Sequence, residues 1–322
     1  MAVVPDTDGF TEAAEPFRRE LFAHCYRLLG SIQDAEDTVQ ETYLRAWRSF
    51  RSFEGRSSLR TWLYQIATNR CLTELAKRSR RLLPSGAGAP EPDPGAPLRV
   101  GADVSWLQPV PDAMLDPAAV VAARATVRLA LVASLQHLPP RQRAVLVLRD
   151  VLGFPAADVA AMLDTTTASV KSALQRARAR LAELGLTDDD VTEPAAPRAR
   201  ELLDRYIAAF ENADADALER LLLADATLEA TPLRTWFRGR AVCLPFLRDR
   251  LLGAPGDWRM HPTSANGQPA AVALRRDASG ILRPYGICVL TVTAAGIGRI
   301  TSFGDPALVT DSFAVPARSS WV

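Results

Sequence analysis

Hydrophobic positions in the first quarter of the chain recur with helical spacing. In residues 32–50 the apolar side chains fall on one face of a helix: Val39, Tyr43, Ala46, Trp47 and Phe50. A second helical pattern covers residues 59–81 and ends in a basic run, and cations suit a helix C-terminus because they oppose the helix dipole. The pattern predicts a helical domain over residues 10–82.

The periodicity stops in residues 84–97, where Pro, Gly and Ala fill 11 of the 14 positions. Such a composition favours neither a helix nor a strand, so we expect a flexible linker over residues 83–116. Trp106 and Leu107 are unusual in a spacer, and we expect them to dock on another surface.

Helical spacing returns in residues 117–184. Pro139 and Pro140 break the pattern, and Gly153 breaks it again before a short helix over residues 156–163. The run 164–167 (DTTT) offers N-caps for a last helix over residues 168–184. Short helices joined by one tight turn are typical of a helix-turn-helix unit. A second linker, acidic and containing proline, is expected over residues 187–197.

The pattern changes class from residue 198. Residues 198–226 predict two amphipathic helices, and residues 242–252 predict a third. Strand-like runs then follow at 258–264, 270–275, 285–293 and 297–303, separated by turns that contain glycine. Helices followed by an antiparallel sheet indicate an α+β domain.

Composition narrows these expectations. The 322 residues are 48% hydrophobic and 23% charged, with a net charge of +1, so any nucleic-acid site must come from local charge. The sequence contains neither a long uncharged apolar stretch nor a signal-peptide pattern, which predicts a cytoplasmic protein. The four cysteines lie far apart and show no CxxC spacing, so we expect neither a disulfide scaffold nor a zinc ribbon. We also expect no other metal site and no cofactor.

The last predicted helix of the helix-turn-helix unit carries the clearest chemistry. Between residues 165 and 182 it holds four cations and no acid, and its polar face also presents Ser172 and Gln175. Cations neutralise phosphates, while Ser, Gln and Lys read base edges in the major groove. The alternative is a solvated basic helix face.

Two further stretches in the first domain stand out. Residues 53–69 combine a glycine-bearing polar loop with aromatic and basic residues, and this combination is typical of sites that hold single-stranded bases. Trp62, however, lies on the same apolar helix face as Leu59 and Ile66, so we expect it in the core. Residues 34–41 are acidic, which a helix N-terminus alone explains for Asp34 and Glu36. A polar face away from the apolar stripe remains available to bind a protein: Asp37, Gln40, Glu41 and Leu44.

Three blocks together resemble the extracytoplasmic-function (ECF) sigma factors, small bacterial transcription initiation factors. The blocks are SIQDAEDTVQETYLRAWRSF, FEGRSSLRTWLYQIATNRCLTELAKR and LPPRQRAVLVLRDVLGFPAADVAAMLDTTTASVKSALQRARARL, in the family's order. The resemblance implies that Asp37, Gln40 and Glu41 contact the β′ clamp helices of core RNA polymerase. It implies that Phe53 and Asn69 read the minus-ten element, and that the linker threads toward the polymerase active-site cleft.

The resemblance also implies a set of promoter contacts. Residues expected to hold the promoter backbone are Lys77, Arg78, Arg80, Arg81, Arg141 and Arg149. Residues expected to read the minus-thirty-five element are Lys171, Ser172, Gln175 and Arg176, and Arg178 lies on the same basic face. The implied partners are core RNA polymerase and promoter DNA, with an anti-sigma factor or a small ligand as possible regulators.

Most ECF sigma factors end near residue 185, whereas this chain continues. Residues 198–322 resemble a SnoaL-like α+β cone, which implies a ligand pocket that Trp236, Phe237 and His261 are candidates to line. Candidate acid or base groups are Asp225, Glu229 and His261, but no diagnostic spacing links them, so we expect regulation and no enzymatic activity. The other hypotheses are a one-component regulator with a ligand-sensing C-terminal domain and a cyclase or isomerase fused to a DNA-binding module.

The expected architecture is therefore multidomain, with two all-α sigma domains followed by an α+β domain. The predicted boundaries are 10–82 for sigma region 2, 83–116 for the flexible linker, 117–186 for sigma region 4, 187–197 for the second linker and 198–322 for the SnoaL-like domain.

Overall fold

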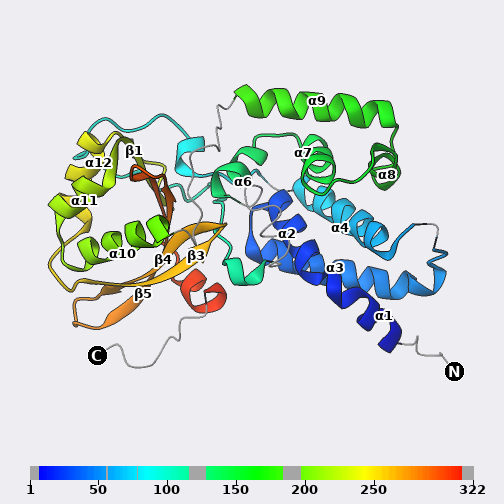
Figure 1. The fold of residues 1–322 in the computed structure, drawn as a ribbon, viewed down its shortest axis with the longest axis horizontal. Coiled ribbons are helices and arrows are strands. Elements are labelled where there is room, and N and C mark those ends of the chain that lie inside the picture. The colour runs from blue at the N-terminus through cyan, green and yellow to red at the C-terminus, as the bar shows by residue number, and fades with distance from the viewer. Residues whose placement is uncertain (1–6, 56, 78, 116–127, 184–196, 314–322) are drawn as a thin grey trace. The chain divides into compact units, whose positions relative to one another are not determined.

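The computed structural model describes residues 7–55, 57–77, 79–115, 128–183 and 197–313. The chain divides into two compact units, one made of residues 1–81 and 113–186 and the other of residues 82–112 and 187–322 (Figure 1). Residues 83–116 were expected to be a flexible linker between two domains. Most of that segment instead belongs to the C-terminal unit.

The first unit begins with helices whose ends follow the sequence closely. They are α1 (Thr7–Ala14), α2 (Arg18–Leu29), α3 (Ile32–Ser49) and α4 (Leu59–Leu75). Gly30 ends α2 with a left-handed φ of 70°, and Ser31 caps α3 by accepting from the Asp34 amide at 3.2 Å. Ser58 caps α4 in the same way through the Thr61 amide at 3.0 Å. Helix α4 ends at Leu75, so the basic run 77–81 follows the helix and does not form its last turn.

The second half of this unit contains the helix-turn-helix. Its elements are α6 (Leu129–Leu135), α7 (Pro140–Leu146), which continues as a π turn over Val147–Val151, α8 (Ala156–Met162) and α9 (Thr167–Glu183). A left-handed turn at Asp164, with φ of 47°, separates α8 from α9. These elements confirm the helix-turn-helix expected from sequence, while residues 116–127 and 184–196 of the predicted domain and second linker lie outside the described residues.

The two helical halves of the first unit pack directly against each other. The Phe154 ring, which precedes α8, lies 5.2 Å from the Tyr64 ring of α4 in an edge contact. The Arg60 guanidinium lies 4.9 Å from the centre of the Phe154 ring. Buried Arg143 of α7 donates to the carbonyl of Leu28 at the end of α2. The sequence predicted two separate domains, but these contacts join them.

The second unit is a six-stranded sheet covered by helices. Helices α10 (Pro197–Glu211), α11 (Ala215–Leu221) and α12 (Arg240–Phe246) accompany strands β1 (Leu222–Thr231), β2 (Trp236–Arg238), β3 (Trp258–Ala265), β4 (Gln268–Arg276), β5 (Leu282–Val292) and β6 (Ile297–Phe303). The strand order is β2-β1-β6-β5-β4-β3, and the β1–β6 pair is parallel. The α+β expectation is confirmed.

Strand β1 was missed by the periodicity. Residues 222–226 were expected to extend a helix, but the chain turns into the sheet at Leu222. Leu222, Ala226 and Leu228 are buried in the core of the unit, between the sheet and its helices. Pairing with both β2 and β6 makes β1 an interior strand, and this long-range pairing outweighs the local helical pattern.

Residues Leu82–Asp112, called the strap below, run across the C-terminal unit without regular secondary structure apart from short 3₁₀ turns. Backbone hydrogen bonds attach the strap along its length: Glu91 N to Trp236 O at 2.8 Å, Gly101 N to Pro232 O at 2.8 Å and Asn266 N to Val110 O at 2.9 Å. Asp103 forms an ion pair with Arg234 at 2.7 Å. The sequence therefore predicted correctly that the strap is irregular, but its expected flexibility was wrong.

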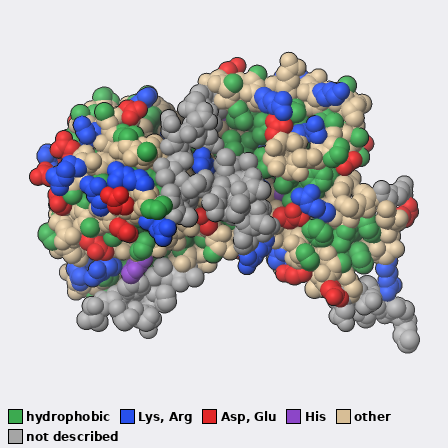
Figure 2. All heavy atoms as spheres, in the orientation of Figure 1, with side chains coloured by type: hydrophobic (Ala, Val, Ile, Leu, Met, Phe, Trp, Pro, Cys, Tyr) green, Lys and Arg blue, Asp and Glu red, His purple; other side chains and the backbone are tan. Residues whose placement is uncertain are grey.

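Figure 2 shows acidic and basic side chains interspersed over the visible face of each unit. Among the described residues, no helix is both long enough and apolar enough to cross a membrane.

Candidate nucleic-acid and protein interfaces

Helix α9 presents the candidate DNA-reading face. Thr166 caps the helix by accepting from the Ser169 amide at 3.1 Å. Val170 and Ala177 are buried against the rest of the helix-turn-helix, which fixes the rotation of the helix about its axis. The predicted reading residues consequently point outward and are exposed: Lys171, Ser172, Gln175 and Arg176.

The cations around α9 differ in whether they already form hydrogen bonds or ion pairs within the protein. Lys171 and Arg176 have no acidic partner in the described part of the chain. Arg178 makes two 2.8 Å hydrogen bonds to Asp150, which raise the pKa of its guanidinium, although its side chain stays 62% exposed. Arg141 is exposed, whereas Arg149 donates to the Phe154 carbonyl. Arg149 thus closes the turn before α8, and this structural role competes with its expected phosphate contact.

Some residues of the basic run after α4 also form ion pairs within the protein. Lys77 reaches Glu74 at 3.3 Å and remains exposed, as does Arg80. Arg81 pairs with Asp34 at 2.7 Å, with only 20% of its side chain exposed, so it ties the run to the start of α3. Arg78 lies outside the described residues. Lys77 and Arg80 are therefore the described members of this run that are most accessible to a phosphate backbone.

Phe53 and Asn69 lie on the same half of the unit but in different surroundings. The Phe53 ring packs 4.9 Å from the half-buried Trp62 ring. Asn69 belongs to a shallow groove of about 450 Å³ that is also lined by Arg45, Trp62 and Arg70. The Asn69 amide donates to the Met162 carbonyl of α8 at 3.2 Å. The candidate reader of one promoter element is thus hydrogen-bonded to the domain that would read the other.

Helix α3 presents the candidate polymerase-binding face. Asp37, Gln40 and Leu44 are exposed, and Leu44, at 44%, is a large apolar side chain open to solvent. Glu41 pairs with Arg45 one turn later at 2.7 Å, and this hydrogen bond lowers the pKa of Glu41. An exposed leucine flanked by acidic and amide groups suits a partner surface that combines an apolar contact with basic residues.

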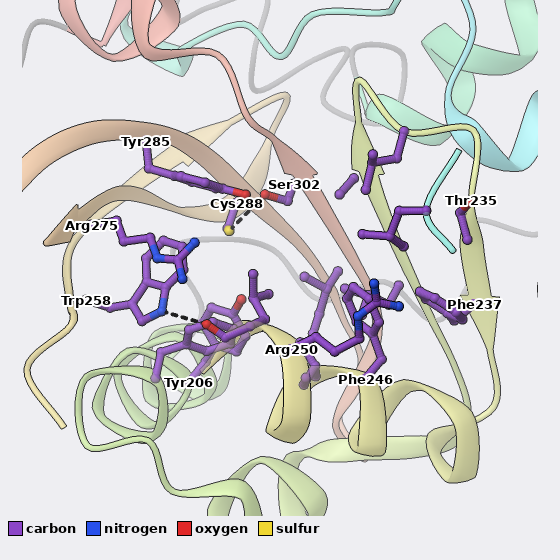
Figure 3. Close-up of a pocket in the computed structure, with 18 of the residues that line it drawn as sticks. Tyr206, Thr235, Phe237, Phe246, Arg250, Trp258, Arg275, Tyr285, Cys288 and Ser302 are labelled. Carbon is purple, nitrogen blue, oxygen red and sulfur yellow. Dashed lines mark hydrogen bonds between the residues drawn. The ribbon is translucent and has the colours of Figure 1, made fainter. Parts of the chain in front are cut away.

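The C-terminal unit contains a cavity of about 280 Å³. Aromatic side chains from α10, α12, β2 and β3 line it, among them Tyr206, Phe237, Phe246 and Trp258 (Figure 3). Phe237 was predicted here, but Trp236 and His261 are not among the lining residues. Trp236 instead donates to the Gly88 carbonyl of the strap at 2.8 Å. The sequence therefore predicted Phe237 correctly as a lining residue but was wrong for Trp236 and His261. It missed the lining residues that come from helix α10 and from the strap.

The candidate acid–base groups of this unit are not brought together. Glu229 is 1% exposed and accepts hydrogen bonds from the Ser85 amide at 3.0 Å, from Thr301 at 3.1 Å and from Arg299 at 3.3 Å. Asp225 is exposed on β1, and His261 lies on β3 at the other end of the sheet order. Glu229 is therefore an anchor for the start of the strap.

Comparisons with known proteins identify the two halves of the helical unit. Family models for sigma-70 region 2 and sigma-70 region 4 match residues 14–81 and 128–181. The ECF RNA polymerase sigma factor SigG of Mycobacterium tuberculosis is 47% identical over 304 residues, which cover 93% of this chain and 82% of SigG. This chain belongs to the ECF sigma factors.

A second relative extends the comparison to the whole fold. SigJ of M. tuberculosis is 33% identical to this sigma factor over 215 residues, 66% of this chain and 62% of SigJ. The crystal structure of SigJ covers 96% of this chain and all of that chain with a TM-score of 0.63 at 24% identity, which shows a shared fold. As an ECF sigma factor, the protein acts with core RNA polymerase on promoter DNA to direct transcription initiation.

Proposed function

We propose that α9 and α3 form two separate interfaces of the initiation complex, α9 reading the minus-thirty-five element and α3 docking on core polymerase. The exposed row Lys171, Ser172, Gln175 and Arg176, held outward by buried Val170 and Ala177, carries this assignment. A helix inserted in the major groove needs such a row of donors and acceptors on one face.

On α3, Leu44 supplies the apolar centre of the proposed polymerase contact. It lies one or two turns from Asp37 and Gln40 on the same exposed face. A partly buried apolar anchor surrounded by polar groups is the usual composition of a protein interface. Replacing Leu44 by a glutamate would remove the apolar anchor and force a carboxylate to lose its water at the centre of that contact.

The packed first unit corresponds, in our proposal, to a closed state that must open on the promoter. The two promoter elements lie more than two helical turns apart, at about 35 Å per turn. In the closed unit, Asn69 is hydrogen-bonded to Met162, five residues before α9 begins. Because one rigid closed unit spans too little distance, both elements are read together only after the two halves separate.

The C-terminal unit has a regulatory and non-catalytic role in this proposal. Glu229, its most buried candidate catalytic acid, is held by Arg299 and by the strap. The same unit retains the segment expected to thread toward the polymerase active-site cleft, through contacts such as Asn266 Oδ1 with Val110 N at 2.9 Å. Holding the strap keeps it from that path, so the C-terminal unit would restrain initiation.

Two single variants test the proposed interfaces. Leu44→Glu is expected to abolish binding to core polymerase, while Ile281→Glu, which changes an exposed apolar residue of the C-terminal unit, leaves it unchanged. Arg176→Ala is expected to keep core binding and to reduce promoter-specific initiation about 5- to 150-fold, the effect of one lost base contact of about 1–3 kcal/mol. Arg205→Ala, an exposed arginine of α10, is the matched control.

Core binding is measured by size-exclusion chromatography and initiation by run-off transcription. If Leu44→Glu binds core polymerase like the wild type, or Arg176→Ala initiates like Arg205→Ala, the assignment of that helix is wrong. A one-component regulator would lose operator binding in Arg176→Ala and show no dependence on core polymerase.

A further inference from the structure

The cavity of the C-terminal unit combines an apolar interior with a cationic rim. Of the described residues that line it, the only charged ones are Arg250 and Arg275. Figure 3 shows Arg275 beside Trp258 on one side of the cavity and Arg250 beside Phe246 on the other. Two arginines around an aromatic cavity without a lining carboxylate create a local positive potential that favours an anionic ligand.

Neither arginine is neutralised by an acid within the described part of the chain. The Arg275 guanidinium lies over the Trp258 ring, 5.1 Å from its centre. Arg250 donates through Nη1 to the strap carbonyls of Ala96 at 2.7 Å and Pro94 at 3.4 Å, and its guanidinium lies 5.6 Å from the centre of the Phe246 ring. Stacking and carbonyl contacts orient both groups while leaving donors for a bidentate anion.

The interior also offers a buried polar group to a ligand. The Tyr206 hydroxyl is fully buried at the cavity wall, where its polar neighbour is the Cys288 thiol, and the described residues give it no oxygen or nitrogen partner. Burial, together with the neighbouring Cys288 thiol, raises the pKa of Tyr206 well above its usual value, so the hydroxyl stays protonated as a donor. Buried hydroxyls are nearly always paired, so a ligand acceptor is a natural partner for this one.

The strap forms part of the same cavity. Leu98 is one of its lining residues, and the adjacent Arg99 amide donates at 2.9 Å to Thr235, which lines the cavity too. Arg250 joins the rim to Ala96. A ligand in the cavity therefore contacts Leu98 only while the strap is docked, and a ligand that contacts one state of a protein more than another favours that state.

We propose that this cavity binds a small apolar monoanion, with its acid group at Arg275, and that the bound ligand holds the strap against the C-terminal unit. The volume of about 280 Å³ sets the size at the lower end of small-molecule sites. The binding test needs no transcription, so its outcome is separate from that of the proposed interfaces.

Binding is measured on the full-length protein with the fluorescent aromatic sulfonate 8-anilinonaphthalene-1-sulfonate. We expect one saturable site from which decanoate displaces the probe at least ten times more effectively than decylamine, its cationic counterpart. Arg275→Gln is expected to weaken decanoate binding at least tenfold. Arg238→Gln, an exposed arginine of the same unit that does not line the cavity, should leave it unchanged.

A cavity-filling variant separates the cavity from other apolar surfaces. Ala230 lines the cavity, and Ala230→Phe should remove the saturable site while the far-ultraviolet circular dichroism stays that of the wild type. If that spectrum changes, Ala230→Leu is used. Equal displacement by decanoate and decylamine, or retained probe binding in a folded cavity-filled variant, would overturn the proposed site.

The coupling to the strap is read by trypsin. Arg99 is the only lysine or arginine in residues 82–112, so cleavage after it reports on the strap alone. Decanoate should slow this cleavage at least fivefold in the wild type and leave it unchanged in the cavity-filled variant. Unchanged or faster cleavage of the wild type with bound decanoate would overturn the coupling.

Discussion

Phe154→Leu tests the closed state of the helical unit most selectively. The substitution keeps most of the apolar volume but removes the aromatic ring that touches Tyr64 at 5.2 Å and Arg60 at 4.9 Å across the two halves. An edge-to-face pair contributes about 0.5–1.5 kcal/mol, and a cation–π contact about 0.5–1 kcal/mol. The loss of about 1–2.5 kcal/mol shifts the closing equilibrium about 5- to 70-fold toward the open state.

Two measurements read this shift. Dyes on cysteines introduced at the exposed positions Glu12 and Ala179 report the separation of the halves by single-molecule energy transfer. Promoter-specific initiation in run-off transcription should rise by the same factor, because it scales with the open fraction while that fraction is small. Phe10→Leu is the control, since the Phe10 ring contacts Tyr43 and Phe50 within its own half.

Wild-type values of both the energy-transfer distribution and promoter-specific initiation in Phe154→Leu would refute the proposed closed state. It is equally refuted if Phe10→Leu opens the unit to the same extent. Lower promoter-specific initiation in Phe154→Leu would mean that the closed form reads the promoter.

Three further predictions concern stability and reactivity. Burial, with Arg27 and Arg60 nearby, lowers the pKa of His24 to about 3, so between about pH 6.5 and pH 3 the unfolded chain binds a proton that the folded chain does not. The free energy of unfolding should therefore fall by about 1.4 kcal/mol per pH unit as the pH drops through this range. His24→Gln should reduce the difference in unfolding free energy between urea curves at pH 5 and pH 7, and an unchanged difference would contradict the lowered pKa. Gly286→Ala should destabilise the C-terminal unit by about 2–4 kcal/mol, because a Cβ there would lie 1.9 Å from the Phe303 carbonyl oxygen. Thermal melting measures this loss, and a melting curve like that of the wild type would contradict the close approach of β5 and β6. All four cysteines are buried, and burial raises the pKa of Cys243 to about 11, so Ellman's reagent should react with them only after denaturation; rapid reaction of the native protein would contradict this burial.

Features set by local sequence could be predicted without the structure. The exposed face of α3 and the outward row of α9 follow from helical periodicity, since Val39, Val170 and Ala177 mark the buried side of each helix. The α9 cap and the turn at Asp164 likewise depend on residues within a few positions of each other.

Features set by distant partners could not be predicted. The strap has the composition of a spacer, and its anchors lie far away in the sequence, as in the pair of Val110 and Asn266, 156 positions apart. Such contacts also join the two helical halves through Phe154. They likewise direct the Trp236 indole N–H to the Gly88 carbonyl of the strap and not into the pocket. Arg81 and Arg149 look like free cations in the sequence, but the fold gives them Asp34 and the Phe154 carbonyl as partners.

The most direct test of the central claim is run-off transcription with core polymerase and the full-length protein, on promoters selected from a genomic fragment pool. The expected result is specific initiation that requires the protein and that Leu44→Glu abolishes. Binding of a defined duplex with no initiation at any selected promoter would contradict it.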